Sequence, residues 1–227
     1  MIEDPDFGAA KEEDMDNDSL IISHLTLRRA LGSLGIALPF ILAIVGYVVF
    51  GAGLQDSISD YYHTGMRDVF VGIIVSIGIF LAAYTGYEDD APLGDNLVAN
   101  VASLGAIVLA LFPTAPSAGP NPLPPWVGIV HWIFSALFFL ALAYFCLFLF
   151  TRTHPDRAPS PEKLMRNTVY RTCGVVIVAC LVLIALNALL PLGLGALKPV
   201  FWLESAAVIA FGVAWLVKGE TLLADPS

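Results

Sequence analysis

The chain has 227 residues, of which 57% are hydrophobic and 14% are charged, and its mean hydropathy is +0.78. Soluble domains carry about 25% charged residues, so the composition excludes an ordinary soluble domain, a chain disordered throughout and a protein that binds nucleic acid through a basic surface. The formal net charge is −9, and most of it comes from residues 1–18, which hold eight acidic residues and one lysine.

The first 31 residues precede the first long apolar run. Residues 1–18 are polar and acidic, so we expect a disordered, solvated tail that offers a docking segment for a protein partner. In residues 19–31, apolar side chains alternate with polar His24, Arg28 and Arg29. This pattern predicts an interfacial amphipathic helix that leads into the first membrane crossing. The alternative is a longer first helix.

Six apolar runs follow, each with the length of a membrane helix. A bilayer core about 30 Å thick requires about 20 apolar residues in helical form. The runs cover residues 32–54, 68–87, 96–115, 127–150, 169–190 and 199–217. None of them shows the ten-residue alternation of a membrane β-barrel. We therefore predict an all-α polytopic membrane bundle with six transmembrane helices within residues 32–220, followed by a C-terminal tail at 221–227.

The connection between the fourth and fifth runs is the most basic in the chain. It carries Arg152, Arg157, Lys163 and Arg166. Positive residues concentrate in short cytoplasmic loops, so we place this connection in the cytoplasm. Counting crossings from there places the N- and C-termini in the cytoplasm and the connections 55–67, 116–126 and 191–198 on the outer side.

Polar side chains from four separate stretches gather at one depth, near the predicted outer face. Ionisable groups within membrane segments are costly, so each is a candidate site residue. The set comprises Ser59, Asp60, His63, Arg67, Asp68, His131, Asn187 and Glu204. The sequence therefore predicts an outer pocket that binds a small solute or a lipid headgroup, in a binding or transport-like protein surrounded by the lipid bilayer.

Other interpretations of these residues stay open, and none assigns a catalytic residue. His63, His131 and Glu204 are ligand types that suit zinc, which would make the protein a metal-dependent membrane hydrolase acting on a lipid or ester. The two histidines could instead flank a haem iron. In a structural interpretation, the polar groups pair with one another, and the protein is an accessory membrane subunit.

Two stretches carry a resemblance to known proteins. The segments SISDYYHTGMRDVFVG (57–72) and FWLESAAVIAFGVAWLVKGE (201–220) resemble uncharacterised bacterial multi-pass inner-membrane proteins. The likeness extends over most of the chain after the acidic tail. It implies a six-helix fold in the inner (plasma) membrane of a bacterium and carries no assigned activity.

A shorter pattern is similar to the ceramidase and adiponectin-receptor superfamily of membrane hydrolases. Members have Ser-x-x-x-His near one membrane face, a later Asp and His-x-x-x-His on the last helix, which together bind zinc. Ser59 and His63 match the first element, and Asp68 is the candidate for the later Asp. The last helix has Glu204 and no histidine, and six crossings are predicted where that superfamily has seven.

Overall fold

The computed structural model describes residues 5–86, 93–116, 120, 122–153, 158–190 and 193–223, with side chains described from residue 24 onward. Its elements are α1 (Pro5–Phe50), the 3₁₀ turn η1 (Ser59–His63), α2 (Arg67–Ala82), α3 (Asp95–Leu111), α4 (Pro125–Tyr144), the π-helical turn η2 (Phe145–Leu149), α5 (Pro161–Leu189), the 3₁₀ turn η3 (Gly195–Leu197) and α6 (Pro199–Lys218). Arg157 of the predicted basic connection lies outside the described residues.

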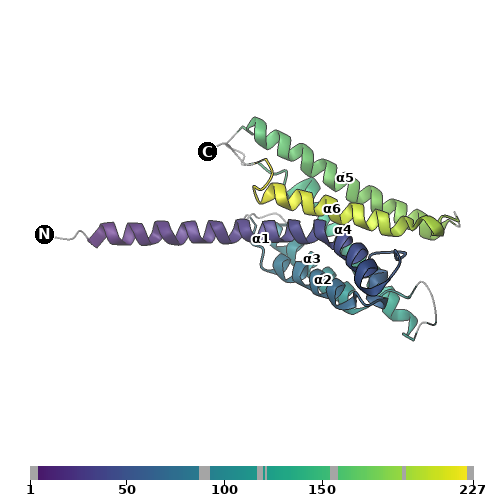
Figure 1. Cartoon of the computed structure of the whole chain (residues 1–227). Helices are drawn as coiled ribbons and strands as arrows, with labels where there is room; N and C mark the ends of the chain where they lie inside the picture. The colour runs from purple at the N-terminus through teal and green to yellow at the C-terminus, as the bar shows by residue number, and fades with distance from the viewer. Residues whose placement is uncertain are drawn as a thin grey trace.

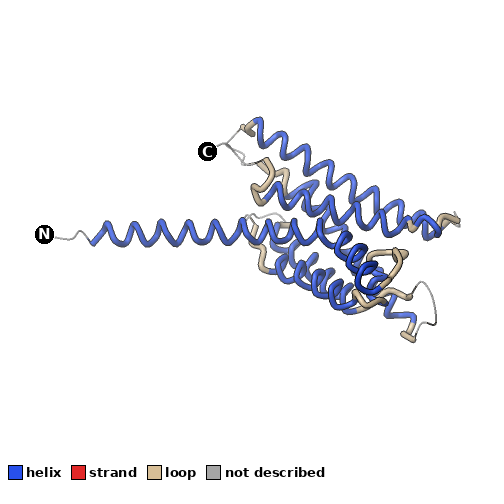
Figure 2. The backbone as a smooth tube through the Cα atoms, viewed as in Figure 1, coloured by secondary structure: helices blue, strands red, loops and turns tan. Residues whose placement is uncertain are grey.

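The described residues form helices and connections without a strand (Figure 2), which confirms the prediction of an all-α protein. Each of the six α-helices occupies one of the predicted apolar runs. Four stretches are long and apolar enough to cross a membrane: His24–Phe50, Pro125–Leu149, Pro161–Leu189 and Pro199–Lys218. At 16 and 17 residues, α2 and α3 are shorter, which corresponds to about 24 and 26 Å of helix at 1.5 Å per residue.

The N-terminal region differs from the sequence-based expectation. The structure has one helix from Pro5 to Phe50, with no break at residue 31 between an interfacial helix and a crossing. The helix also includes residues 5–18, where a disordered tail was predicted. Alanine, lysine and glutamate in this stretch are strong helix formers, and a helix that is already nucleated extends through such residues at little cost.

The described helices α1 to α6 form a closed ring in which helices that follow one another in the chain pack together, and α1 packs more extensively on α6 than on α2. The N-terminal part of α1 extends beyond the bundle (Figure 1). Close backbone packing joins α1 to α6: a Cβ atom added at Gly212 would lie 2.7 Å from the carbonyl oxygen of Gly32. Small residues permit this approach between membrane helices.

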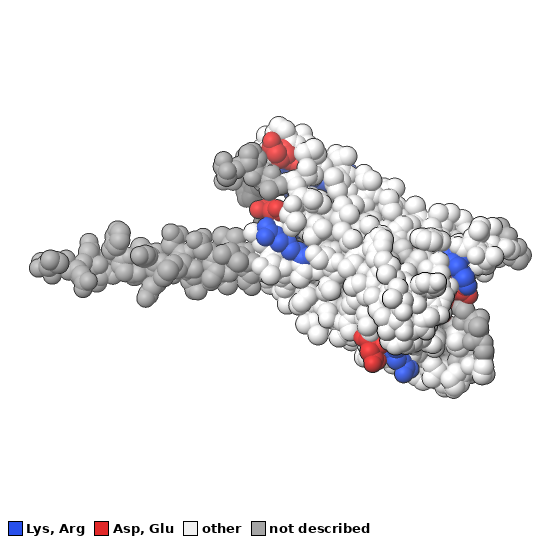
Figure 3. Space-filling model, viewed as in Figure 1, with Lys and Arg blue, Asp and Glu red and all other residues white. Residues whose placement is uncertain are grey.

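The outer surface of the ring is apolar along its length. Large side chains such as Ile44, Leu104, Leu140 and Val182 are more than half exposed. On the face shown in Figure 3, charged side chains gather at the two ends of the bundle, with an uncharged band between them. An exposed apolar band of this size suits a lipid environment and would be unusual in water.

The two ends of the bundle differ in their connections. We call the end formed by the described residues 51–66, 112–116, 122–124 and 193–198 the loop end. The opposite end, formed by residues 83–86, 93–94, 150–153 and 158–160 with the C-terminal end of α6, is the tail end. Figure 1 shows the N- and C-termini on the same side of the bundle.

Candidate functional site

At the loop end, the segment after α1 is fastened to the start of α6. The backbone N–H of Phe201 donates to the carbonyl oxygen of Asp56 over 3.0 Å. This N–H lies in the first turn of α6, where no carbonyl of the helix can accept it. The Lys198 ammonium also pairs with the Asp56 carboxylate. These contacts place the residues that follow Asp56 across the end of the bundle.

The next residues form η1, in which the side chains of Ser59, Asp60 and Tyr61 are buried. The Tyr61 ring is fully buried and lies 6.2 Å, centroid to centroid, from the Phe201 ring. Burial raises the pKa of Tyr61 above its usual value, so this phenol stays neutral at physiological pH. The Ser57 hydroxyl accepts a hydrogen bond from the backbone N–H of Asp60 at 3.0 Å. The anchored turn leaves Ser59 facing α4.

Glu204 turns from the second turn of α6 towards η1. Its Oε2 atom accepts a hydrogen bond from the backbone N–H of Ile58 at 2.7 Å. The carboxyl group is partly buried, and it lines two cavities. The backbone N–H of Ser59 also points to this carboxyl group. Because two carboxyl oxygens offer about four acceptor positions, the group keeps the capacity to hydrogen-bond a molecule in either cavity.

His131 on α4 is buried, and both of its ring nitrogens have neighbours. Nδ1 lies 3.0 Å from the carbonyl oxygen of Leu109 and 2.8 Å from that of Phe112. Nε2 lies 3.1 Å from the Ser59 hydroxyl. Carbonyl oxygens only accept hydrogen bonds, so the hydrogen-bond network assigns the proton of the neutral ring to Nδ1. Nε2 is then an acceptor for the Ser59 O–H.

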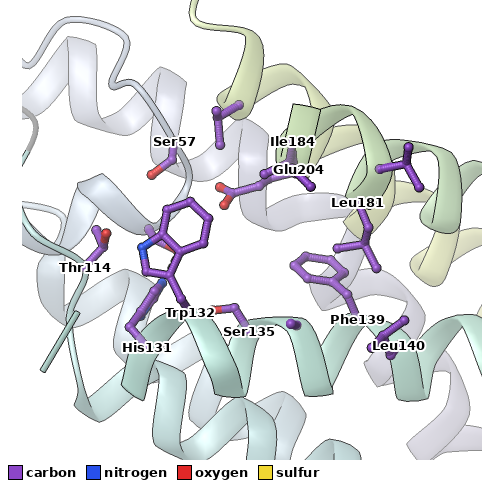
Figure 4. A pocket seen from close by; sticks show the side chains of 15 residues that line it. Ser57, Thr114, His131, Trp132, Ser135, Phe139, Leu140, Leu181, Ile184 and Glu204 are labelled. Atoms are coloured by element: carbon purple, nitrogen blue, oxygen red, sulfur yellow. Dashed lines mark hydrogen bonds between the residues drawn. The ribbon is translucent and has the colours of Figure 1, made fainter. Parts of the chain in front are cut away.

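These groups face a cavity of about 350 Å³ between η1, α4, α5 and α6. Figure 4 shows Ser57, Ser135 and Glu204 with their oxygens directed into the same space. The polar lining residues are Ser57, Ser59, Thr114, His131, Ser135 and Glu204. The rest of the lining is apolar and comes largely from α4 and α5. The cavity therefore has a polar end and an apolar body.

A second, small cavity of about 20 Å³ adjoins the polar end and is lined by Ser59, Ser135 and Glu204 among other residues. The Ser135 hydroxyl oxygen is shielded from solvent and has no hydrogen-bond partner among the described residues. Most of its lining is apolar, but a cavity of this size with three polar side chains can hold one water molecule. The polar end therefore has a hydroxyl and a carboxyl group available to a bound molecule.

The structure brings together three of the eight residues predicted for the site: Ser59, His131 and Glu204. Asp60 and His63 line a separate surface hollow of about 360 Å³, together with Lys198. His63 is exposed and contacts the Thr114 carbonyl oxygen through Nε2 at 2.8 Å. Asp60 is nevertheless buried, at 5% exposure. The predicted outer cluster is thus divided between two separate hollows at the loop end.

The remaining three predicted residues do not line the main cavity. Arg67 is exposed at the start of α2 and lies over the Tyr62 ring, 4.3 Å from its centroid. Asp68 follows it and is also exposed, and Asn187 is partly buried on α5. The first turn of α2 directs its charged residues away from the bundle, which the sequence of the connection did not indicate.

Three further polar side chains line the cavity but were not among the predicted site residues: Ser57, Thr114 and Ser135. Ser135 is one helical turn after His131, so the helical period places it on the same face, and this spacing could have identified it. Ser57 belongs to the same polar stretch as Ser59. Thr114 lines the cavity because of the conformation of the loop after α3, and no pattern in the sequence predicts that conformation.

The predicted metal ligands do not form a group. Among the described residues, no three His, Cys, Asp or Glu side chains are placed to hold a metal ion together. His131 uses its ring nitrogens on backbone carbonyls and Ser59, while His63 faces the surface hollow. The prediction of zinc at His63, His131 and Glu204 is therefore not supported by the geometry of these side chains.

The chain matches no protein-family model, no curated protein and no solved structure.

Proposed function

We propose that the protein binds a neutral amphiphilic molecule of the membrane in the loop-end cavity. The polar head would lie against Glu204, Ser135 and His131, and the apolar chain would lie between α4 and α5. The observation that carries this proposal is the separation of polar and apolar lining within one cavity. Its volume, about 350 Å³, is in the range of small-molecule sites.

The lining favours a neutral head over an anionic one. No lysine or arginine is among the described residues that line the cavity, and Glu204 contributes a carboxyl group. Phosphate groups in proteins are usually held by arginine, lysine or helix N-termini. Hydroxyl, imidazole and carboxyl groups instead suit a head that both donates and accepts hydrogen bonds, such as a glycerol or an ester.

The position of the apolar lining supports entry from the side. Trp132, Leu140 and Val182 line the cavity and are each more than half exposed on the outer surface of the bundle. The contact between α4 and α5 is also less extensive than that between α3 and α4. A membrane lipid would therefore reach the cavity through the α4–α5 seam without crossing water.

The proposal includes a topology. We propose that all six α-helices cross the inner membrane of a bacterium, with both termini in the cytoplasm. The two short helices would be accommodated by local thinning of the bilayer. Arg28, Arg152, Lys163 and Lys218 lie at the tail end, in agreement with the preference of positive residues for the cytoplasmic side. A reporter that is active only in the periplasm can be fused to the C-terminus to test this orientation. We expect no signal, and a signal would contradict the proposed topology.

Filling the cavity tests the binding proposal. Ala185 lines the cavity, whereas Ala188, three residues later on α5, does not line it and is exposed. We expect Ala185→Trp to reduce binding of 1-dodecylglycerol at least tenfold and Ala188→Trp to leave it unchanged. The ether lipid retained by purified protein in detergent would be measured by native mass spectrometry. Equal binding by both variants would contradict the proposal.

A further inference from the structure

We propose that Ser59 and His131 form a nucleophile–base pair that cleaves ester amphiphiles bound in the loop-end cavity. This inference rests on the proposed binding function and adds a reaction to it. The substrate class is a neutral ester of a fatty acid, with a glycerol or similar alcohol as the leaving group.

The first support is the geometry of the pair. The Ser59 hydroxyl lies 3.1 Å from Nε2 of His131, within the distance at which a base takes the proton of a nucleophile. The two carbonyl oxygens at Nδ1 fix the orientation and tautomer of the ring, with Nε2 unprotonated. They would also stabilise the imidazolium that forms when Nε2 accepts a proton, which is the role of the carboxylate in a catalytic triad.

The second support is access to the cavity. Ser59 is nearly buried within the protein but lines the cavity that we assign to the substrate. The apolar body of the cavity places an acyl chain between α4 and α5, so that the ester at the end of the chain lies beside the polar groups. The hydroxyl is thus shielded from bulk water and accessible to a bound lipid.

The third support is the unpartnered hydroxyl of Ser135. It lies one turn from His131 on α4 and borders both cavities beside Ser59. Its oxygen has no hydrogen-bond partner among the described residues. A hydroxyl in this position can donate to the oxyanion that develops when an ester is attacked, and such donors raise the rate about 100- to 1,000-fold.

The reaction follows from these positions. Ser59 Oγ attacks the ester carbonyl carbon while its proton moves to Nε2 of His131, and the carbonyl oxygen becomes an oxyanion facing Ser135. When the carbon–oxygen bond to the alcohol breaks, the imidazolium returns the proton to the leaving oxygen. The products are a free alcohol and an acyl group on Ser59.

Water completes the cycle. A water molecule that takes the place of the released alcohol in the loop-end cavity, which His131 and Ser59 both line, gives a proton to His131 and attacks the acyl carbon. The bond to Ser59 then breaks, Ser59 Oγ recovers the proton, and a fatty acid is released. Each step moves one proton between named groups and requires no oxidant or reductant.

Covalent labelling tests the pair. We expect a dodecyl fluorophosphonate to modify Ser59, as identified by peptide mass spectrometry, and purified protein to release laurate from 1-lauroylglycerol. Ser59→Ala should abolish both signals. His131→Gln should slow labelling at least 100-fold, the usual contribution of a general base. Ser76→Ala, which removes an exposed hydroxyl on α2, should change neither.

Binding of 1-dodecylglycerol separates the possible failures, because this ether cannot be cleaved. If the ether binds but Ser59 is not labelled, the catalytic inference is wrong and the binding function stands. If the ether does not bind to the wild type, both proposals fail. If His131→Gln binds the ether and is labelled at the wild-type rate, His131 is not the base. His131→Gln is compared with the wild type after size-exclusion chromatography shows that it is folded, because His131 also lines the binding cavity.

Discussion

The two ends of the bundle bury polar side chains in different ways. At the tail end, charged groups pair with each other and pack on aromatic rings. At the loop end, uncharged hydroxyls, one imidazole and one carboxyl group face a cavity. Charged clusters within packed side chains hold helices in place, whereas polar groups around a cavity are available to a ligand. We therefore propose that the polar side chains of the tail end stabilise the fold and that those of the loop end bind the ligand.

At the tail end, charged and aromatic side chains from several elements contact one another. Asp95 at the start of α3 is 3% exposed; its Oδ2 atom accepts a hydrogen bond from the Tyr84 hydroxyl at 3.2 Å, and Oδ1 lies 3.9 Å from the Arg152 guanidinium. Arg28 lies over the Tyr84 ring, 5.7 Å from its centroid. The Trp215 ring packs edge-to-face on Tyr84 at 5.0 Å. These contacts join α1, α3, α6 and both connections of this end.

The largest expected effect is loss of folding, from a change in the contact between α1 and α6. Because this contact closes the bundle, its loss should disrupt both ends. Gly212→Leu would drive a side chain into the backbone of α1 near Gly32. We expect loss of the folded, monodisperse protein in size-exclusion chromatography. Gly72→Leu is the matched control, because a Cβ atom at Gly72 meets nothing within 4 Å. A folded Gly212→Leu variant would show that α1 and α6 do not pack in this way.

The next largest effect should be confined to the tail end. Asp95→Ala removes a buried carboxylate that accepts from the Tyr84 hydroxyl and lies 3.9 Å from the partly exposed Arg152. Loss of a buried hydrogen-bond partner costs about 1–3 kcal/mol. We expect a clear fall in the thermal unfolding midpoint in detergent, with 1-dodecylglycerol still bound below that temperature. Asp68→Ala removes an exposed acid from the first turn of α2 and should change stability by about 0.5 kcal/mol or less. Lost binding in a folded Asp95→Ala variant would contradict the division between the ends.

The converse effect is expected at the loop end. Glu204→Gln keeps an oxygen that can accept from the Ile58 N–H but changes the group that faces the cavity. We expect binding of 1-dodecylglycerol to fall about tenfold, or about 1.4 kcal/mol, with stability changed by less than about 1 kcal/mol. Glu162→Gln, at the tail end in the first turn of α5, is the control and should leave binding unchanged. A Glu204→Gln variant that unfolds readily but binds normally would reverse our assignment.

The smallest effect is expected at the surface of the loop end. Asp56→Asn removes the charge that pairs with Lys198 but keeps the carbonyl that accepts from Phe201. Because both side chains are about one-third or more exposed, the pair should contribute about 0–1 kcal/mol, and less at high salt. Thermal unfolding at low and high ionic strength measures this contribution. A larger loss that salt does not reduce would mean that this connection depends on the pair.

The sequence predicted the helices well because hydrophobicity along the chain directly reflects burial in a bundle or bilayer. It predicted Ser59, His131 and Glu204 as one group because counting residues from the helix ends places them at one depth. The depth of a residue in the membrane does not predict whether its side chain points into the bundle or away from it. For this reason Arg67 and Asp68, which lie at the same depth, were included although the structure directs them outward.

The boundaries within the first 50 residues were less predictable. Polar His24 and Arg28 interrupt the apolar pattern, which suggested a change of environment and therefore a separate element. Helix formation depends on backbone hydrogen bonds and local propensity, which continue through such residues. Pro39 also lies inside α1 without ending it, as membrane helices permit.

The most direct test of the central claim is to locate the bound lipid. The protein would be reconstituted with an alkylglycerol that carries a photoreactive diazirine at the end of its chain, and crosslinked peptides would be mapped by mass spectrometry with and without excess 1-dodecylglycerol. The account predicts competable crosslinks on α4 at residues 132–140 and on α5 at residues 181–185. Crosslinks spread over all exposed helix faces, unchanged by the competitor, would contradict it.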